Sequence, residues 1–287
     1  MPATSAITLV MPEAFDDAVA ALAEFGPDGA PLAGGTWIMR APIRGEARRG
    51  AYVGLGRIAA LQAVDLDDDE IRIGACVTHV GLVAALSDVP QCRGLVTAAA
   101  KAANPAVRQM ATIGGNLAAW EFPASDLTPA LLSLEAAVEL RSPGGTERVS
   151  LERFLLRRRA VEPGILVSRV VIPRMPLTTG HARLPLRKAG DYPVAIVSAA
   201  ASMDGHGKVD DIRLAVGSVE ASARRWPGLE RALLGARLDP ASAQELARER
   251  SGDFAGRDSV EAPAWYRVQV LPALVRRAVE AVLASPR

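Results

Sequence analysis

Two pairs of glycines carry the chemistry that this sequence offers most clearly. Gly34 and Gly35 stand in the stretch PLAGGTWIMR, and Gly114 and Gly115 stand in ATIGGNLAAWEFPASDLTPALL. Glycine tolerates positive φ and lets a ligand approach without a Cβ in the way, and successive N–H groups in such a loop form a concave nest for an anion. A neighbouring threonine adds a hydroxyl donor. Two such loops, one on each domain, predict a clamp for a pyrophosphate that uses no lysine.

Two other side chains suit the rest of such a ligand. Asp126 closely follows the second glycine pair, and a carboxylate accepts hydrogen bonds from a sugar diol well. Trp37 directly follows the first loop and can stack on a flat ring. A lone glycine pair is more often a plain turn, and that alternative stays open for either loop. The stretch VGLGRIAAL lacks the third glycine of a dinucleotide fingerprint, so we interpret it as a structural turn.

Other candidates for chemistry are weak. The three histidines, His79, His181 and His206, are far apart in sequence and form no HExxH motif. Cys76 and Cys92 form no CxxC, so a disulfide framework, a zinc site and an iron–sulfur cluster are unsupported and buried thiols are the preferred interpretation. No GxSxG motif is present. We therefore assign no catalytic residue and no metal ligand, and expect an organic cofactor to supply the chemistry.

Length and charge narrow the class of protein. A chain of 287 residues predicts two or three subdomains, and a net charge of +1 gives no electrostatic basis for binding nucleic acid or anionic lipid. The basic run Arg157–Arg159 is interpreted as a solvated helix end. We see no signal peptide and no apolar stretch of about 18 residues that could span a membrane. We therefore expect a soluble, cytoplasmic protein.

Strand and helix patterns mix along the chain without regular βαβ alternation, which favours an α+β fold. We expect three regions, 1–55, 56–173 and 174–287. Thr78 and Thr128 are expected to cap helices. The helix at 94–104 is expected to stop at Asn104-Pro105. Strands are predicted at 6–10, 51–55, 61–64, 71–75, 165–173 and twice within 194–219, a hairpin at 137–150, and helices at 13–26, 79–86, 94–104, 128–136, 230–238, 241–250 and 266–284.

Six stretches occur in an order that identifies a family. They are LAGGTWIMRAPIRG, YVGLGRIAAL, IRIGACVTHVGLVAAL, AANPAVRQMATIGGNLAA, SDLTPALLSLEAAVEL and RKAGDYPVAIVSAA. The chain resembles the FAD-binding medium subunits of the molybdenum hydroxylases, the carbon monoxide dehydrogenase and xanthine dehydrogenase type, over nearly its whole length. The resemblance implies a two-subdomain FAD-binding fold of the vanillyl-alcohol-oxidase type, followed by a C-terminal antiparallel sheet with helices.

The resemblance also implies roles for matching positions. The first loop and the second loop would hold the pyrophosphate, and Ser125 and Asp126 would hold the ribose or ribityl part. Leu166 would lie beside the flavin, and Lys188 and Tyr192 near its ring, where the lysine would steady negative charge on reduced flavin. The chain departs from the family at Trp37, Trp120 and Phe122, which stand where other or smaller residues are common. The two loops comprise Leu32, Ala33, Gly34, Gly35, Thr36 and Trp37, and Thr112, Ile113, Gly114, Gly115 and Asn116.

The resemblance also implies that this chain works together with further subunits. The resemblance implies a molybdenum cofactor in a large subunit and [2Fe–2S] clusters in a small subunit, with electrons passing through FAD on this chain to an external acceptor. A dimer of three-subunit units is expected. Two alternatives stay open: a stand-alone flavin oxidase, which would need its own acid/base residues, and an assembly subunit that keeps the fold without FAD.

Overall fold

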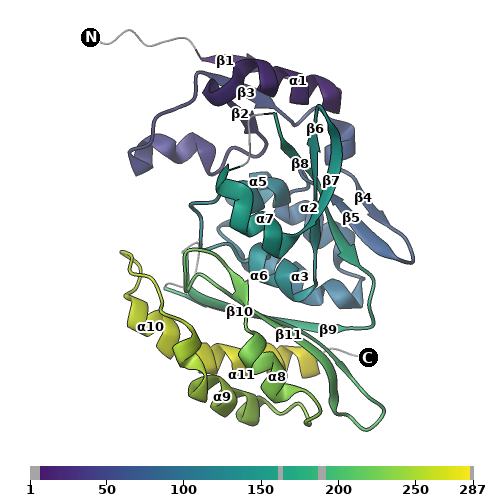
Figure 1. The fold of residues 1–287 in the computed structure, drawn as a ribbon, viewed down its shortest axis with the longest axis vertical. Helices are drawn as coiled ribbons and strands as arrows, with labels where there is room; N and C mark the ends of the chain where they lie inside the picture. The colour runs from purple at the N-terminus through teal and green to yellow at the C-terminus, as the bar shows by residue number, and fades with distance from the viewer. Residues whose placement is uncertain (1–6, 161–163, 187–191, 285–287) are drawn as a thin grey trace.

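The computed structural model describes residues 7–160, 164–186 and 192–284. Three β-sheets follow one another along the long axis of the molecule, with the first sheet at the top of Figure 1 and the third at the bottom. Helices mix with these sheets without regular alternation, so the fold is α+β, as the sequence predicts. Within the described residues, no helix is both long and apolar enough to cross a bilayer.

The first sheet is small and parallel. Its strands lie in the order β1-β3-β2, and α1 packs against β2 and β3. α1 ends at Gly26, whose φ of 53° suits a glycine that stops a helix. The loop after β2 carries the first glycine pair. We call this sheet with its loops the first lobe; its elements are β1 (Thr8–Val10), α1 (Phe15–Phe25), β2 (Gly29–Leu32) and β3 (Ala51–Gly54).

The second sheet is antiparallel, in the order β4-β5-β8-β6-β7, and six helices accompany it. Its strands are β4 (Val64–Leu66), β5 (Glu70–Gly74), β6 (Ala137–Ser142), β7 (Gly145–Ser150) and β8 (Leu166–Pro173). The helices are α2 (His79–Leu86), α3 (Arg93–Lys101), α4 (Pro105–Met110), α5 (Ile113–Ala118), α6 (Leu127–Ser133) and α7 (Leu151–Arg157). Aliphatic side chains from the sheet and the helices share one buried core. We call this unit the second lobe.

The third sheet is antiparallel and lies between two groups of helices. α3 and α6 contact it from the second lobe, and α8 and α11 contact it from the other side, as Figure 1 shows. This confirms the expected C-terminal antiparallel sheet with helices. Its order is β12-β11-β10-β9. The elements are β9 (Thr178–Pro185), β10 (Pro193–Met203), β11 (Val209–Gly217), β12 (Arg224–Arg225), α8 (Pro227–Leu233), α9 (Pro240–Glu249), α10 (Ala264–Gln269) and α11 (Leu271–Leu283).

Several expected boundaries were wrong. The strand predicted at 61–64 begins only at Val64, as β4, and the helix predicted at 266–284 is divided into α10 and α11. Two expected helix ends also differ. Thr128 lies inside α6, and Asp126 occupies the position before that helix. The helix predicted to stop at Asn104 already ends at Lys101, and the side chain of Asn104 instead accepts a hydrogen bond from the backbone N–H of Val107 at 2.9 Å. Asn104 therefore caps the extra helix α4, which the sequence pattern did not reveal because α4 is only six residues long.

Candidate functional site

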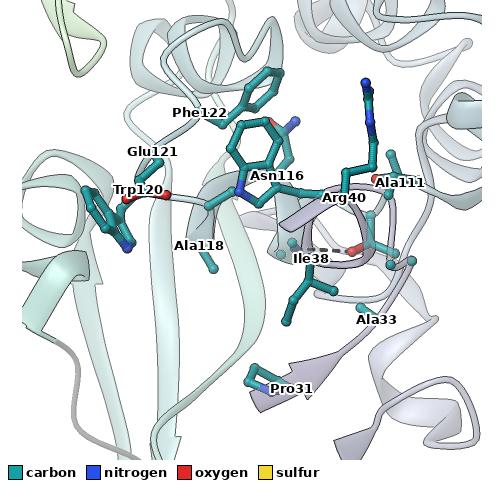
Figure 2. Close-up of a pocket in the computed structure, with 18 of the residues that line it drawn as sticks. Pro31, Ala33, Ile38, Arg40, Ala111, Asn116, Ala118, Trp120, Glu121 and Phe122 are labelled. Carbon is teal, nitrogen blue, oxygen red and sulfur yellow. Dashed lines mark hydrogen bonds between the residues drawn. The ribbon is translucent and has the colours of Figure 1, made fainter. Parts of the chain in front are cut away.

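A cavity of about 1240 Å³ lies between the first and second lobes. Pro31, Ala33 and Arg40 line it from the first lobe, and Asn116 and Trp120 from the second, as Figure 2 shows. The loop after β2 reaches the cavity because the parallel strands of the first sheet all end at that edge. α5 reaches the cavity from the opposite lobe. The size of the cavity fits a large organic ligand.

The first glycine loop is an open backbone cradle. The backbone N–H groups of Gly35, Thr36 and Trp37 have no acceptor within the described part of the chain, and all three residues line the cavity. Gly35 has a φ of 70°, which lies in the left-handed region that anion-binding backbone nests use. This loop therefore has the donors that an anionic group such as a diphosphate requires.

The second glycine loop works differently from the prediction. The N–H of Ile113 donates to Val77 O, that of Gly114 to Ala75 O, each at 2.9 Å, and that of Asn116 to Thr112 O at 2.9 Å. The N–H of Gly115 donates to Thr112 Oγ1 at 3.2 Å. These amides cap and begin α5, so the expected second backbone nest is wrong. The remaining donors of this loop are one backbone N–H, that of Thr112, together with the Thr112 hydroxyl and the Asn116 side-chain amide.

One glycine of each pair is required by packing between protein segments. A Cβ on Gly34 would stand 1.7 Å from the carbonyl oxygen of Met110, which ends α4. A Cβ on Gly114 would stand 2.7 Å from the Cβ of Ala75. Gly34 therefore lets the two lobes meet backbone to backbone, and Gly114 seats α5 against the strand edge. Both bring the loops together rather than clear space for a ligand.

A buried polar network lies beside the second loop. The Ser125 hydroxyl donates to Asn116 Oδ1, which directs the Asn116 amide nitrogen elsewhere. Asp126 Oδ1 accepts from Arg183 Nε at 2.9 Å and lies 3.3 Å from His181 Nε2. The Nδ1 of His181 lies 2.9 Å from the hydroxyl of Ser198 in β10. Because Asp126 also lines the cavity, this network links the cavity to the third sheet.

His79 is a candidate that the sequence alone did not mark. It begins α2, lines the cavity and is 3% exposed, and neither ring nitrogen has a hydrogen-bond partner within the described residues. Burial lowers the pKa of His79 to about 4, with the charge of Asp126 acting in the opposite direction. The imidazole is therefore neutral at pH 7, and a polar ligand group nearby would satisfy it.

Aromatic side chains form one part of the cavity lining. The ring centroid of Phe122 lies 4.9 Å from that of Trp37 and 5.3 Å from that of Tyr192. The Arg44 guanidinium lies 3.9 Å from the centre of the Trp37 ring and forms an ion pair with Glu46. Trp37 thus contacts protein groups, and its stacking on a cofactor ring stays a prediction.

The structure brings most of the predicted site residues to this one cavity. Leu32, Ile113 and Ser125 do not line it, and Lys188 lies outside the described residues. The reading of Arg157–Arg159 as a solvated helix end was wrong for its central member, because Arg158 is buried and lines the cavity. The predicted residues that do line it are Ala33, Gly34, Gly35, Thr36, Trp37, Thr112, Gly114, Gly115, Asn116, Asp126, Leu166 and Tyr192.

These groups fit a dinucleotide with a diphosphate bridge. The open amides of the first loop match diphosphate oxygens, and the unpartnered His79 and the Asp126 carboxylate match hydroxyl groups. Apolar side chains of Leu140, Phe154 and Leu166 supply a surface for a flat ring. The described residues hold no cluster of three or more side chains that could together ligate a metal ion.

Comparisons with known proteins agree with this arrangement. Residues 5–175 match the family model for the FAD binding domain in molybdopterin dehydrogenase, and residues 183–282 match that for the CO dehydrogenase flavoprotein C-terminal domain. The carbon monoxide dehydrogenase medium chain of Afipia carboxidovorans is 29% identical over 272 residues, covering 94% of each chain. The 6-hydroxypseudooxynicotine dehydrogenase complex subunit alpha of Paenarthrobacter nicotinovorans is 28% identical over 97% of this chain and 95% of that protein.

Solved structures show the same fold. A chain of the reconstituted CO dehydrogenase from Oligotropha carboxidovorans superimposes with a TM-score of 0.88 at 27% identity, covering 98% of this chain and 99% of that one. A chain of the carbon monoxide dehydrogenase from Hydrogenophaga pseudoflava gives 0.90 at 26% identity, with the same coverage. The chain therefore belongs to the family of FAD-binding domains in molybdopterin dehydrogenases, as an FAD-binding medium subunit of the molybdenum hydroxylase type.

Proposed function

We propose that this chain binds FAD in the cavity between its first two lobes and relays electrons from [2Fe–2S] centres of a partner subunit to an external acceptor. The observation that carries the proposal is the loop of open amides at Gly35, Thr36 and Trp37, which faces Thr112 and Asn116 across one cavity. FAD, when bound, supplies a carrier that accepts and releases electrons. The residues of this chain bind it, orient it and separate it from bulk water.

Different residues of the cavity contact different parts of the ligand. The first loop holds the diphosphate through backbone N–H groups, and the Thr112 hydroxyl and the Asn116 amide complete that contact from the second lobe. Asp126 accepts from a ribose or ribityl hydroxyl. Leu166 lies against the flavin, and Tyr192 near its ring. We propose that Lys188 also lies near the ring. Leu32, Ile113 and Ser125 do not line the cavity and are proposed to stabilise the two loops.

The remaining redox centres belong to partner subunits. Cys76 and Cys92 are free and buried, and burial raises the pKa of their thiols to about 11 and about 12, which disfavours the thiolates that a cluster requires. We therefore place [2Fe–2S] clusters in a small subunit and the molybdenum cofactor in a large one, in a cytoplasmic dimer of heterotrimers. The names of two relatives, a medium chain and a complex subunit alpha, describe those proteins as parts of assemblies.

The proposal is tested by purifying the tagged full chain from cells that express it and recording what accompanies it. We expect flavin absorption bands, FAD released by denaturation, and two co-purifying chains that carry molybdenum and iron. Yellow colour that stays on the denatured chain, with no partner, would instead indicate a stand-alone flavin oxidase. Partners without flavin bands would indicate an assembly subunit that lacks FAD. Either of these results would contradict the proposal.

A further inference from the structure

Arg158 is a buried cation that has no anionic partner among the residues that the structure describes. It is 9% exposed, and its one hydrogen bond within the described residues runs from Nη1 to the carbonyl oxygen of Leu117 at 2.7 Å. Other arginines near it are partnered differently: Arg157 forms an ion pair with Glu147, and Arg159 lies over the ring of Trp120. No ion pair involves Arg158 in the described part of the chain.

This arrangement leaves charged N–H donors available to a ligand in the cavity. A guanidinium has five N–H donors and remains charged even though burial lowers the pKa of Arg158. A buried charge without a counter-charge is strongly unfavourable. None of the Arg158 nitrogens is both sealed from solvent and unbonded, so its remaining donors have open space before them. Arg158 lines the cavity, and the cavity supplies that space.

The position of Arg158 indicates which part of a ligand it meets. Leu117, whose carbonyl oxygen accepts the hydrogen bond from Arg158, lies near the end of α5, directly after Asn116. Phe154 precedes Arg158 by four residues and also lines the cavity, as do Leu140 and Leu166. Arg158 thus enters the cavity about one helical turn after the apolar side chain of Phe154.

We propose that Arg158 binds the polar, carbonyl-bearing edge of the FAD flavin ring and favours its reduced form. This inference rests on the proposed function. Reduction of the ring adds two electrons and one proton, and the remaining negative charge is spread over that edge. A guanidinium placed there attracts the reduced ring more than the neutral oxidised ring. Arg158 is therefore a group that sets the potential at which this chain accepts electrons.

The test is the midpoint potential of FAD bound to the full chain, measured by dithionite titration against a reference dye. For Arg158→Gln we expect reduced FAD to lose about tenfold more affinity than oxidised FAD, which lowers the two-electron potential by about 30 mV. Arg158→Lys keeps the charge and should stay closer to the wild-type potential. Arg153→Gln, at an exposed position of α7, the helix that ends just before Arg158, is the matched control and should leave the potential unchanged.

Two further measurements keep the inference separate from the proposed function. ADP, which carries the diphosphate but no ring, should bind Arg158→Gln and the wild type equally. If ADP and FAD lose affinity alike, Arg158 acts on the diphosphate and the inference is wrong. If Arg158→Gln does not fold, the midpoint potential of FAD bound to the wild-type chain is compared with that of free FAD. The inference predicts a higher potential for the bound FAD, and a lower potential overturns it. A wild-type chain that binds no FAD refutes the proposed function instead.

Discussion

At the scale of single residues, His79 makes stability depend on pH. Its folded pKa of about 4 lies below the ordinary value of 6.5, so the unfolded chain binds more protons between these two values and stability falls as pH falls through that window. We expect His79 alone to remove about 2 kcal/mol of unfolding free energy between pH 7 and pH 5. Urea unfolding of the FAD-free chain at both pH values measures this.

His79→Gln keeps a polar side chain but does not titrate, so its unfolding free energy should fall by about 2 kcal/mol less than that of the wild type over the same interval. His206 is exposed, which makes His206→Gln the control that should behave like the wild type. Equal acid sensitivity of His79→Gln and the wild type would show that His79 is already protonated or paired when folded.

At the scale of secondary-structure elements, the close contact between the β2 loop and the end of α4 positions the cavity. Gly34→Ala places a Cβ against the Met110 carbonyl, so the loop must move away from the second lobe. We expect about a tenfold loss of FAD affinity, measured by flavin fluorescence. Gly56→Ala, where a Cβ would meet no atom within 4 Å, should bind FAD as the wild type does. Unchanged affinity in Gly34→Ala would mean that this contact does not shape the site.

The elements that could be predicted from the sequence are those with a local signal. Apolar spacing with Thr78 as the cap gave α2 its observed bounds, and the Thr78 hydroxyl does accept from Gly81 N at 3.1 Å. The hairpin predicted at 137–150 is likewise present, as β6 and β7, and its turn carries the local sequence Pro143-Gly144-Gly145. β9 was missed, because its burial depends on α3 and α11, which are distant in sequence.

The site could be predicted only in part, because only part of it has a local signal in the sequence. Glycine pairs identified both loops, but nothing local distinguishes Gly35, whose neighbours have open amides, from Gly114, whose amide bonds to Ala75. Arg158 and His79 line the cavity through tertiary packing, and their sequence neighbours suggested a solvated run and an ordinary helix start. The boundaries at 55 and 173 remain a prediction.

At the scale of the whole molecule, Asp126 joins the second lobe to the third sheet. Asp126→Ala removes the carboxylate that Arg183 and His181 contact, so we expect a loss of about 3 kcal/mol in the free energy of unfolding. Asp16→Ala, which breaks an exposed pair with Arg141, should cost less than about 1 kcal/mol. Urea unfolding compares them, and similar small losses would show that the Asp126 network does not hold the two units together.

The most direct measurement of the central claim is an experimental structure of the full chain with FAD. The account predicts diphosphate oxygens within about 3.2 Å of the backbone nitrogens of Gly35, Thr36 or Trp37, and of the side chain of Thr112 or Asn116. Both lobes would then hold one diphosphate. A diphosphate that contacts only one of these loops, or that lies outside the cavity, would contradict the account.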